Sequence, residues 1–432
     1  MVSRRVSSPH ATGTADRPPV QRAMPPPSGS EPASQSVPVV VTGGAAAYPL
    51  RDFLSRNSVD FVYLDESDSD EALCVLPDGT RLRAPTIAEL AQSLGLRRPQ
   101  RHDLYDLVIV GAGPAGLAAA VYGASEGLRT ALVESTAPGG QAGTSGRIEN
   151  YLGFPDGVGG AELAERARAQ AERLGADLLL AREVVSGGER DGAFTTIMRD
   201  GETVLGRTVL IASGVEWRRL DAPGVERLLH AGVYYGAAAS EAPGTVGKDV
   251  FVVGAGNSAG QAAATFAAVA RSVTLLVRGD DPSSSMSDYL LGRLRDTANV
   301  RIVTEATVTA VDGDDWLRRI SYDQRGHGQR SVPAHALFLC IGGVPRTQWA
   351  AGEHIASSAA GYILAGTDLP RPLSDWGWTL QRDPYPRETN KAGVFVAGDV
   401  RYGSTKRVAT AVGEGAMAVQ LVHRHLAAMT AS

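Results

Sequence analysis

The sequence predicts an α/β fold in which two similar β–α–β units follow a smaller α/β unit. Three observations support this prediction. A short apolar strand runs into a glycine-rich turn and an alanine-rich helix at 107–122, and the same pattern returns at 250–269. The chain of 432 residues is too long for one ordinary domain. Hydrophobic residues make up 43% of the chain, which is enough to bury more than one core.

The composition argues against several classes of function. A formal net charge of -5 indicates no basic surface for nucleic acid, and no apolar run reaches the roughly 18 residues that span a membrane. Residues 3–5 resemble the start of a twin-arginine export signal, but residues 6–36 hold no apolar segment, so export is not expected. The two cysteines, Cys74 and Cys340, form neither a C-x-x-C pair nor a metal cluster. We therefore expect a cytoplasmic protein without a metal site.

The amino-terminal part of the chain divides in two. Residues 1–36 are rich in Pro, Ser and Ala and have almost no large apolar side chains, so we predict a disordered tail. The pattern changes at residue 37, and Pro85 opens an amphipathic helix further along. Before Pro85 we expect a strand at Val37–Val41, a helix at Leu50–Asn57 and a second strand at Phe61–Leu64. Residues 37–98 are thus predicted to form a short β–α–β unit with a late helix.

The first strong motif follows this unit. The strand Leu107–Val110 runs into G-x-G-x-x-G, and a helix begins directly after it. The glycines allow a tight turn and close approach to a pyrophosphate, and the helix N-terminus offers free N–H groups. An acid that ends the next strand, about 20 residues on, is placed to bind a ribose. The alternative is a glycine turn that serves only packing. The candidate nucleotide-binding residues are Gly111, Gly113, Pro114, Ala115, Gly116 and Glu134.

The motif repeats as G-x-G-x-x-A after the strand Val250–Val253. Here the following strand ends in Arg278 instead of an acid. A cation suits a 2′-phosphate, which a carboxylate would repel, so this site is predicted to bind NADP. The serines at 283–285 could add hydroxyl donors. Alternatively, Arg278 is a solvated residue at a strand end. The candidate residues are Gly254, Gly256, Asn257, Ser258, Ala259 and Arg278.

A third element lies near the carboxyl end. The strand Gly393–Ala397 ends in Gly398 and Asp399, and Lys406 opens a long helix. The acid can hold a ribityl chain, and the helix N-terminus can stabilise negative charge at the N1–C2=O edge of a flavin. A surface aspartate in a β–α loop is the alternative. Together the three elements predict FAD at the first fold and NADPH at the second, in two Rossmann-like dinucleotide-binding domains.

From about Tyr105 to its end, the chain resembles the low-molecular-weight thioredoxin reductases and related flavoproteins. The matching motifs are Gly139-Gly140-Gln141, Ile148-Glu149-Asn150-Tyr151, Ala212-Ser213-Gly214, Gly254-Ala255-Gly256-Asn257-Ser258-Ala259, Ile341-Gly342-Gly343 and Ala397-Gly398-Asp399-Val400. The resemblance implies a homodimer and an FAD-binding domain (99–221 and 342–432) that an NADPH-binding domain (222–341) interrupts. The implied flavin residues are Gly140, Gln141, Asn150, Ala212, Gly214, Gly398, Asp399, Lys406, Arg407 and Val408.

The chain departs from this family where the family carries its redox-active C-x-x-C. Gly236 and Ala239 stand at the two cysteine positions. Without a thiolate no disulfide exchange can occur there, so thioredoxin reduction by the family's route is not expected. A second departure is the single Arg278 where the family usually carries two arginines, which weakens the prediction of NADPH.

Residues 37–98 resemble a degenerate glutaredoxin or thioredoxin fold, as in some fused reductases. The turn after the first strand, 43–48, has glycine, alanine and tyrosine where an active module would place cysteines. Both redox centres are therefore missing. Two roles stay open for this unit: it stabilises the fold or a dimer, or it docks a partner.

These features predict hydride transfer from NADPH to FAD and onward to a small-molecule or protein acceptor. No catalytic residue stands out. The nearest candidate proton donors are Tyr234, Tyr235 and Glu241. One alternative is a flavin-dependent oxidase of a secondary metabolite that uses oxygen. The other is a flavin-binding redox sensor or scaffold without catalysis. The sequence does not name the acceptor.

Overall fold

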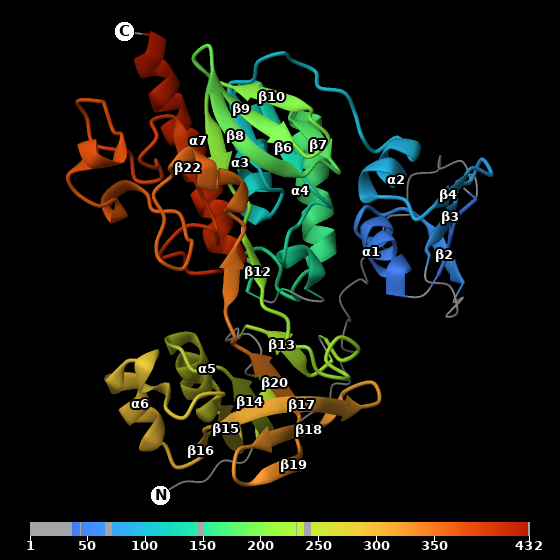
Figure 1. Cartoon of the computed structure of the whole chain (residues 1–432), viewed down its shortest axis with the longest axis vertical. Helices are drawn as coiled ribbons and strands as arrows, with labels where there is room; N and C mark the ends of the chain where they lie inside the picture. The colour runs from blue at the N-terminus through green and yellow to red at the C-terminus, as the bar shows by residue number, and fades with distance from the viewer. Residues whose placement is uncertain are drawn as a thin grey trace, which may run out of the picture.

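The computed structural model describes residues 37–43, 45–64, 71–145, 148, 150–229, 231–236 and 243–430. The predicted disordered tail lies outside these residues. So does the segment 237–242, which includes the second position of the family's dithiol and Glu241. The described chain folds into three α/β units, a small one and two larger ones (Figure 1).

The small amino-terminal unit is built on a four-stranded sheet. Its strand order is β2-β1-β3-β4, with β1 and β2 parallel and the other neighbours antiparallel. This is a β–α–β unit extended by an antiparallel hairpin and a final helix. Figure 1 shows both helices on the side that faces the first large unit. The elements are β1 (Val39–Thr42), α1 (Tyr48–Arg56), β2 (Phe61–Leu64), β3 (Leu73–Val75), β4 (Arg81–Arg83) and α2 (Ile87–Ser93).

Local sequence explains most of this unit. Helix α1 buries Leu50, Phe53 and Leu54. Helix α2 begins after Thr86, whose side chain and that of Glu89 form a reciprocal capping box. The hairpin of β3 and β4 was not predicted, although its Pro-Asp-Gly-Thr turn at 77–80 is a recognised turn signal.

The first large unit has a parallel five-stranded sheet in the order β22-β11-β5-β6-β7. Helices α3, α4 and α7 pack on one face, where small residues allow α3 and α7 to lie close together. An antiparallel sheet of β8, β9 and β10 packs on the other face through Met198 and Val204. The elements are β5 (Leu107–Val110), α3 (Pro114–Ser125), β6 (Thr130–Glu134), α4 (Gly160–Leu174), β7 (Asp177–Leu180), β8 (Val184–Arg190), β9 (Ala193–Met198), β10 (Thr203–Gly206), β11 (Val209–Ile211), β22 (Val394–Val396) and α7 (Val408–Thr430).

The second large unit interrupts the first. Its parallel sheet has the order β13-β20-β14-β15-β16, and α5 and α6 share a core with it. An antiparallel sheet, β17-β18-β19, packs beside it. The elements are β13 (Val233–Tyr235), β14 (Asp249–Val253), α5 (Asn257–Ala267), β15 (Ser272–Leu276), α6 (Asp288–Arg295), β16 (Val300–Val303), β17 (Ala306–Gly313), β18 (Leu317–Gln324), β19 (Gly328–Pro333) and β20 (Ala336–Leu339).

Two short antiparallel strands join the large units. Strand β12 (Val215–Trp217) carries the chain out of the first unit, and β21 (Gly343–Pro345) carries it back. The sheet of the first unit is completed only afterwards, when β22 pairs with β11. Within the described residues, no helix is long and apolar enough to cross a membrane. The same residues hold no group of three or more His, Cys, Asp or Glu side chains that could bind a metal ion.

Candidate functional site

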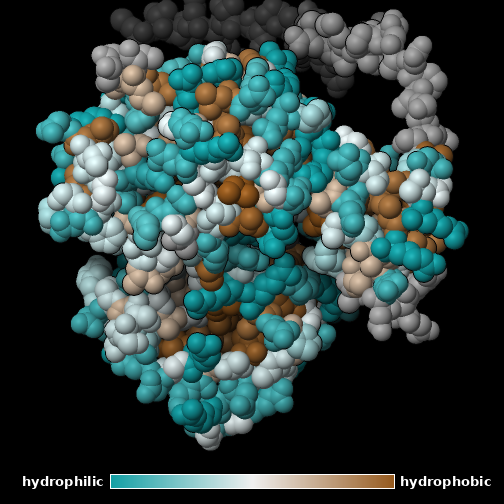
Figure 2. All heavy atoms as spheres, turned by 45° about the horizontal axis from the view of Figure 1, so that its top comes forward, coloured by the Kyte–Doolittle hydropathy of each residue, from teal (hydrophilic) through white to brown (hydrophobic). Residues whose placement is uncertain are grey.

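One large cavity of about 1460 Å³ brings both glycine turns together. Figure 2 shows a hollow between the upper and lower parts of the molecule, with hydrophobic residues at its floor. All but two of the predicted cofactor residues line the cavity. They are Gly111, Gly113, Pro114, Ala115, Glu134, Gly140, Gln141, Asn150, Ala212, Gly214, Gly254, Gly256, Asn257, Ser258, Arg278, Gly398, Asp399, Lys406, Arg407 and Val408.

The two exceptions, Gly116 and Ala259, lie behind the turns instead of facing the cavity. A Cβ atom on Gly116 would stand 1.9 Å from the carbonyl oxygen of Gly111, so only glycine lets α3 approach the turn. Ala259 is fully buried, and a Cβ on Gly254 would lie 3.0 Å from the Cβ of Ala259. Both residues therefore shape the turns by packing and do not line the cavity.

The first turn leaves backbone groups free to meet an anion. Gly111 has a φ of +105°, which favours glycine, and a side chain there would clash with the carbonyl of Ala212. Helix α3 begins at Pro114, and no side chain caps its start at Gly113. The amino end of this 12-residue helix thus presents uncapped N–H groups beside the cavity.

Glu134 joins the first turn to the loop that follows β6. Its Oε2 accepts a hydrogen bond of 2.8 Å from the backbone N–H of Ala112, and its Oε1 accepts one of 2.9 Å from Thr136. The hydroxyl of Ser135 donates a third hydrogen bond, of 3.2 Å to Oε1. A carboxylate has about four acceptor positions, so one remains for a hydroxyl group in the cavity. The predicted acid is therefore well placed, and it also holds the loop geometry.

The third predicted element forms another wall. Asp399 follows β22, and burial raises the pKa of its carboxyl although the positive charge of Lys406 opposes this shift. Lys406 has a φ of +55°, an uncommon conformation for a residue with a side chain. Helix α7 begins two residues later, at Val408, so its amino end borders the cavity.

The lining residues that were not anticipated include Arg56, Trp217 and Tyr362. The Nζ atom of Lys406 donates a 2.8 Å hydrogen bond to the hydroxyl of Tyr362 and lies 5.9 Å from the centre of the Trp217 ring. Trp217 is on the joining strand β12, just after a motif that the sequence analysis recognised. No local pattern marks Arg56 or Tyr362, because each reaches the cavity only through the tertiary fold.

The second turn has the same construction as the first. Gly254 has a φ of +145°, and a side chain there would stand 2.4 Å from the carbonyl oxygen of Cys340. Arg278 is exposed at the cavity edge, two residues beyond β15. Two of the three serines that were expected to add hydroxyl donors are engaged elsewhere. Ser283 donates its hydroxyl hydrogen to Asp281, Ser285 donates to the carbonyl of Ala255, and neither lines the cavity.

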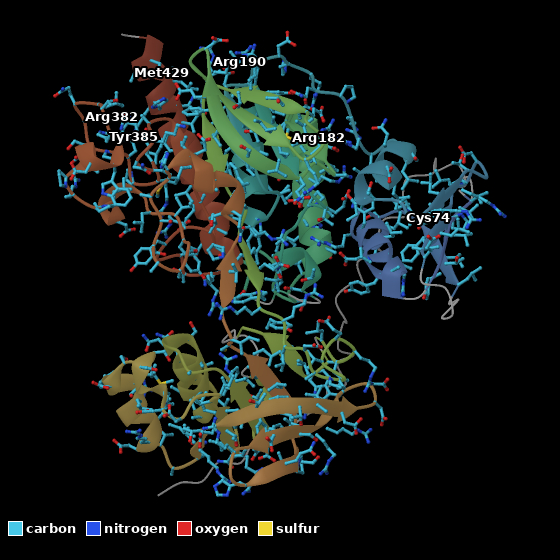
Figure 3. The ribbon with its side chains drawn as sticks, in the orientation of Figure 1. Cys74, Arg182, Arg190, Arg382, Tyr385 and Met429 are labelled. Carbon is cyan, nitrogen blue, oxygen red and sulfur yellow. The ribbon has the colours of Figure 1, made fainter. Side chains whose placement is uncertain are left out.

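The two cysteines lie in different units. Cys74 is buried in the core of the amino-terminal unit (Figure 3), and Cys340 lines the cavity beside the second turn. Burial raises the pKa of each thiol to about 11, which suppresses the reactive thiolate at neutral pH. Of the candidate proton donors, Tyr235 lines the cavity, whereas Tyr234 stacks on Phe338.

Comparison with known proteins identifies the family. Residues 105–415 match the pyridine nucleotide-disulphide oxidoreductase family. The chain belongs to this family. Its members of the thioredoxin reductase type have two dinucleotide-binding domains and bind FAD and NAD(P)H, so the predicted fold class and this pair of cofactors are confirmed. The glycine turns, the uncapped helix start at α3 and the half-buried acids fit two such dinucleotides.

The match covers a different share of each relative's length. One of the alkyl hydroperoxide reductase proteins of Staphylococcus epidermidis is 31% identical over 317 residues, which is 73% of this chain but only 58% of that protein. The bifunctional thioredoxin reductase/thioredoxin of Mycobacterium leprae is 32% identical over 333 residues, or 76% of this chain and 68% of that protein. The thioredoxin reductase structure from Streptococcus pyogenes has a TM-score of 0.66 at 28% identity, covering 76% of this chain and 99% of that one.

Proposed function

We propose that this protein is an FAD-dependent oxidoreductase that takes hydride from NADPH and reduces a small-molecule or protein acceptor without a redox-active dithiol. The observation that carries the proposal is the single cavity lined by both glycine turns and by the Asp399 region. Two dinucleotides bound at the two turns would therefore share one cavity. The acceptor is not identified, and a homodimer is proposed only from family likeness.

The first turn is proposed to hold FAD. Glycines and the uncapped start of α3 would face the diphosphate, and Glu134 would accept a hydrogen bond from the adenosine ribose. Asp399 would accept a hydrogen bond from the ribityl chain, and the amino end of α7 would stabilise negative charge at the flavin edge. When bound, the flavin accepts a hydride from the nicotinamide and passes its electrons to the acceptor. The protein supplies position and charge.

The second turn is proposed to hold NADPH. Gly254, Gly256 and the start of α5 would face its diphosphate, and Arg278 would pair with the 2′-phosphate. A single guanidinium would give a moderate preference over NADH, since the hydroxyls of Ser283 and Ser285 already donate to protein groups.

Electrons leave without a thiol relay in this proposal. The chain has only Cys74 and Cys340, and Gly236 and Ala239 stand where the family carries its dithiol. A proton must accompany the hydride when the acceptor is an organic molecule. The hydroxyl of Tyr362 can donate this proton and recover one from Nζ of Lys406, 2.8 Å away. This pair borders the cavity near Asp399.

Anaerobic mixing of the yellow holoenzyme with NADPH tests the proposal. Loss of the flavin absorbance on mixing, followed by its return when an acceptor is added, is the expected result. A protein that is inert to NADPH but is bleached by an organic substrate, and reoxidised by oxygen, would be an oxidase instead. Inertness toward both kinds of reductant would leave a flavin-binding sensor or scaffold.

A further inference from the structure

The amino-terminal unit touches the loop that closes the first nucleotide site. The last turn of α1 carries Arg56, whose Nη2 lies 3.4 Å from the carbonyl oxygen of Ala137 and 3.3 Å from that of Gly140 and donates to both. The next residue, Asn57, donates from Nδ2 to the carbonyl of Thr136 at 3.2 Å. The carboxyl end of α1 is thus fixed to the 136–140 loop.

Arg56 also reaches the cavity itself. Its side chain is 22% exposed and lines the same cavity as Gly113 and Gly140. These two glycines lie against each other, because a Cβ atom on Gly140 would stand 3.1 Å from the Cα of Gly113. Asp52 is 3.7 Å from Nη1 of Arg56, near the limit for an ion pair, and it is itself partly exposed. Arg56 therefore places positive charge beside the residues proposed to hold a diphosphate.

We propose that Arg56 is a cofactor-binding residue that the amino-terminal unit supplies to the FAD site, where it pairs with the diphosphate. This proposal rests on the proposed function, because it assumes FAD at the first turn. A guanidinium has five N–H donors, and the loop carbonyls use one nitrogen of the three. The remaining donors can meet phosphate oxygens in a planar, charge-assisted arrangement.

A rigid junction would keep Arg56 in this position. Ala181, which follows β7, packs into the core of the amino-terminal unit. Arg182 is buried, donates from Nη2 to the carbonyl of Arg98 at 2.7 Å, and donates to both carboxylate oxygens of Glu202. Figure 3 shows Arg182 on the side of the first large unit that faces the small unit. The guanidinium of Arg56 is therefore held in place before any ligand binds.

The orientation of α1 explains how a thioredoxin-like unit can contribute without cysteines. Helix α1 begins at Tyr48. An active thioredoxin-like module would carry its thiols just before this end of the helix. The helix of 9 residues places that end about 13 Å from the end that meets the cavity. The unit thus offers its charged end to the cofactor and not the end where a thiol would stand. Its role here is to retain the cofactor.

Release of FAD from the holoenzyme provides the test. Wild type, Arg56→Gln, Arg56→Lys, Asn57→Ala and Arg81→Gln are diluted, and free flavin is followed by its fluorescence over a range of salt concentrations. Arg81 is an exposed arginine of the same unit and serves as the control. Losing one charge-assisted interaction should raise the Kd for FAD by about tenfold to a hundredfold in Arg56→Gln. Arg56→Lys should recover part of the affinity, and Arg81→Gln should match wild type.

The salt dependence of FAD release distinguishes two roles for Arg56: pairing with the charged diphosphate, or only fixing the amino-terminal unit to the 136–140 loop. Wild type should lose FAD more readily as salt rises, and this dependence should be weaker in Arg56→Gln. Equal FAD retention by wild type and Arg56→Gln would overturn the proposal. Equal losses in Arg56→Gln, Arg56→Lys and Asn57→Ala, with an unchanged salt dependence, would also overturn it, because Arg56 would then act only through docking. A wild-type protein that cannot bind FAD would instead refute the proposed function.

Discussion

The backbone N–H of Ala112 donates a 2.8 Å hydrogen bond to Oε2 of Glu134, which ties the turn after β5 to the end of the neighbouring strand β6. The other oxygen of the same carboxylate accepts from the backbone of Thr136 at 2.9 Å. One side chain thus fixes the glycine turn and also the start of the loop that Arg56 and Asn57 contact. Glu134, which is proposed to bind the ribose, therefore also holds the site in shape.

Glu134→Gln should weaken FAD binding by about tenfold or more. The amide of glutamine has only one oxygen, so one of the two backbone N–H groups would face an NH2 group instead of an acceptor. Flavin fluorescence on dilution measures the change. Glu183→Gln is the matched control, since Glu183 pairs with Arg199 at the surface and does not line the cavity. Unchanged FAD affinity in Glu134→Gln would argue against its proposed role.

Arg278→Ala should raise the KM for NADPH about tenfold and leave the KM for NADH nearly unchanged. The guanidinium is proposed to meet only the 2′-phosphate, which NADH lacks, and a charge-assisted bond is worth roughly one to two powers of ten in affinity. Steady-state rates with both coenzymes and ferricyanide as acceptor measure this. A wild type that uses both coenzymes equally well, or a variant that weakens both alike, would contradict the assignment of Arg278.

Tyr362→Phe should slow the reduction of a soluble quinone at least tenfold and leave ferricyanide reduction unchanged. A quinone takes up a proton with its electrons, whereas ferricyanide takes up electrons alone, so only the quinone needs the Tyr362 hydroxyl. The phenylalanine ring keeps the packing in the cavity wall. Equal slowing with both acceptors would show that Tyr362 acts in positioning and not in proton transfer.

Glu388 should make the fold sensitive to acid. Burial alone would raise the pKa of this carboxyl, but hydrogen bonds from His425, Arg382 and the backbone lower it to about 2. The group therefore stabilises the fold above its ordinary pKa near 4.5, and this contribution is lost as pH falls from about 4.5 toward 2. The side chain of Arg382 and the backbone N–H of Tyr385 both donate to the carboxylate of Glu388. Figure 3 shows Arg382 and Tyr385 close together beside α7.

Thermal unfolding between pH 2 and 7 checks this expectation. Glu388→Gln should unfold at a lower temperature at pH 7, because the half-buried Arg382 charge loses its fully buried partner. It should also lose much of the acid dependence in the window from about 4.5 to 2. Glu162→Gln, which removes an exposed pair with Arg166, should keep the wild-type profile. An unchanged slope in Glu388→Gln would show that other carboxyls dominate the acid response.

The sequence was most informative where chemistry dictates local spacing. The glycine turns, Glu134 and Asp399 could be located because each needs a strand before it and a set distance along the chain. Element ends were less accurate. Helix α5 begins at Asn257 within the motif, several residues before the apolar run that predicted it. The antiparallel sheets of β8–β10 and β17–β19 were not anticipated, because their strands lack distinctive motifs.

Contacts between units could not be predicted from local patterns. Arg56 sits in a helix of a different unit, 84 residues before Gly140 in the loop that it contacts. Within the first large unit, Tyr362 meets Lys406 across 44 residues of sequence. Such pairs depend on the tertiary fold, which periodicity does not encode. Ser283 and Ser285 illustrate the opposite error, because their hydroxyls donate to Asp281 in the same loop and to the carbonyl of Ala255 in the second glycine turn.

The most direct test of electron transfer without a dithiol is an anaerobic NADPH titration of the holoenzyme and of the Cys74→Ala/Cys340→Ala variant. Each NADPH supplies two electrons, which is what one flavin accepts. We predict that about one equivalent per FAD abolishes the flavin absorbance in both proteins. A requirement for about two equivalents in the wild type, or a variant that retains FAD but is not reduced, would show that a thiol centre stores electrons and would contradict the proposed function.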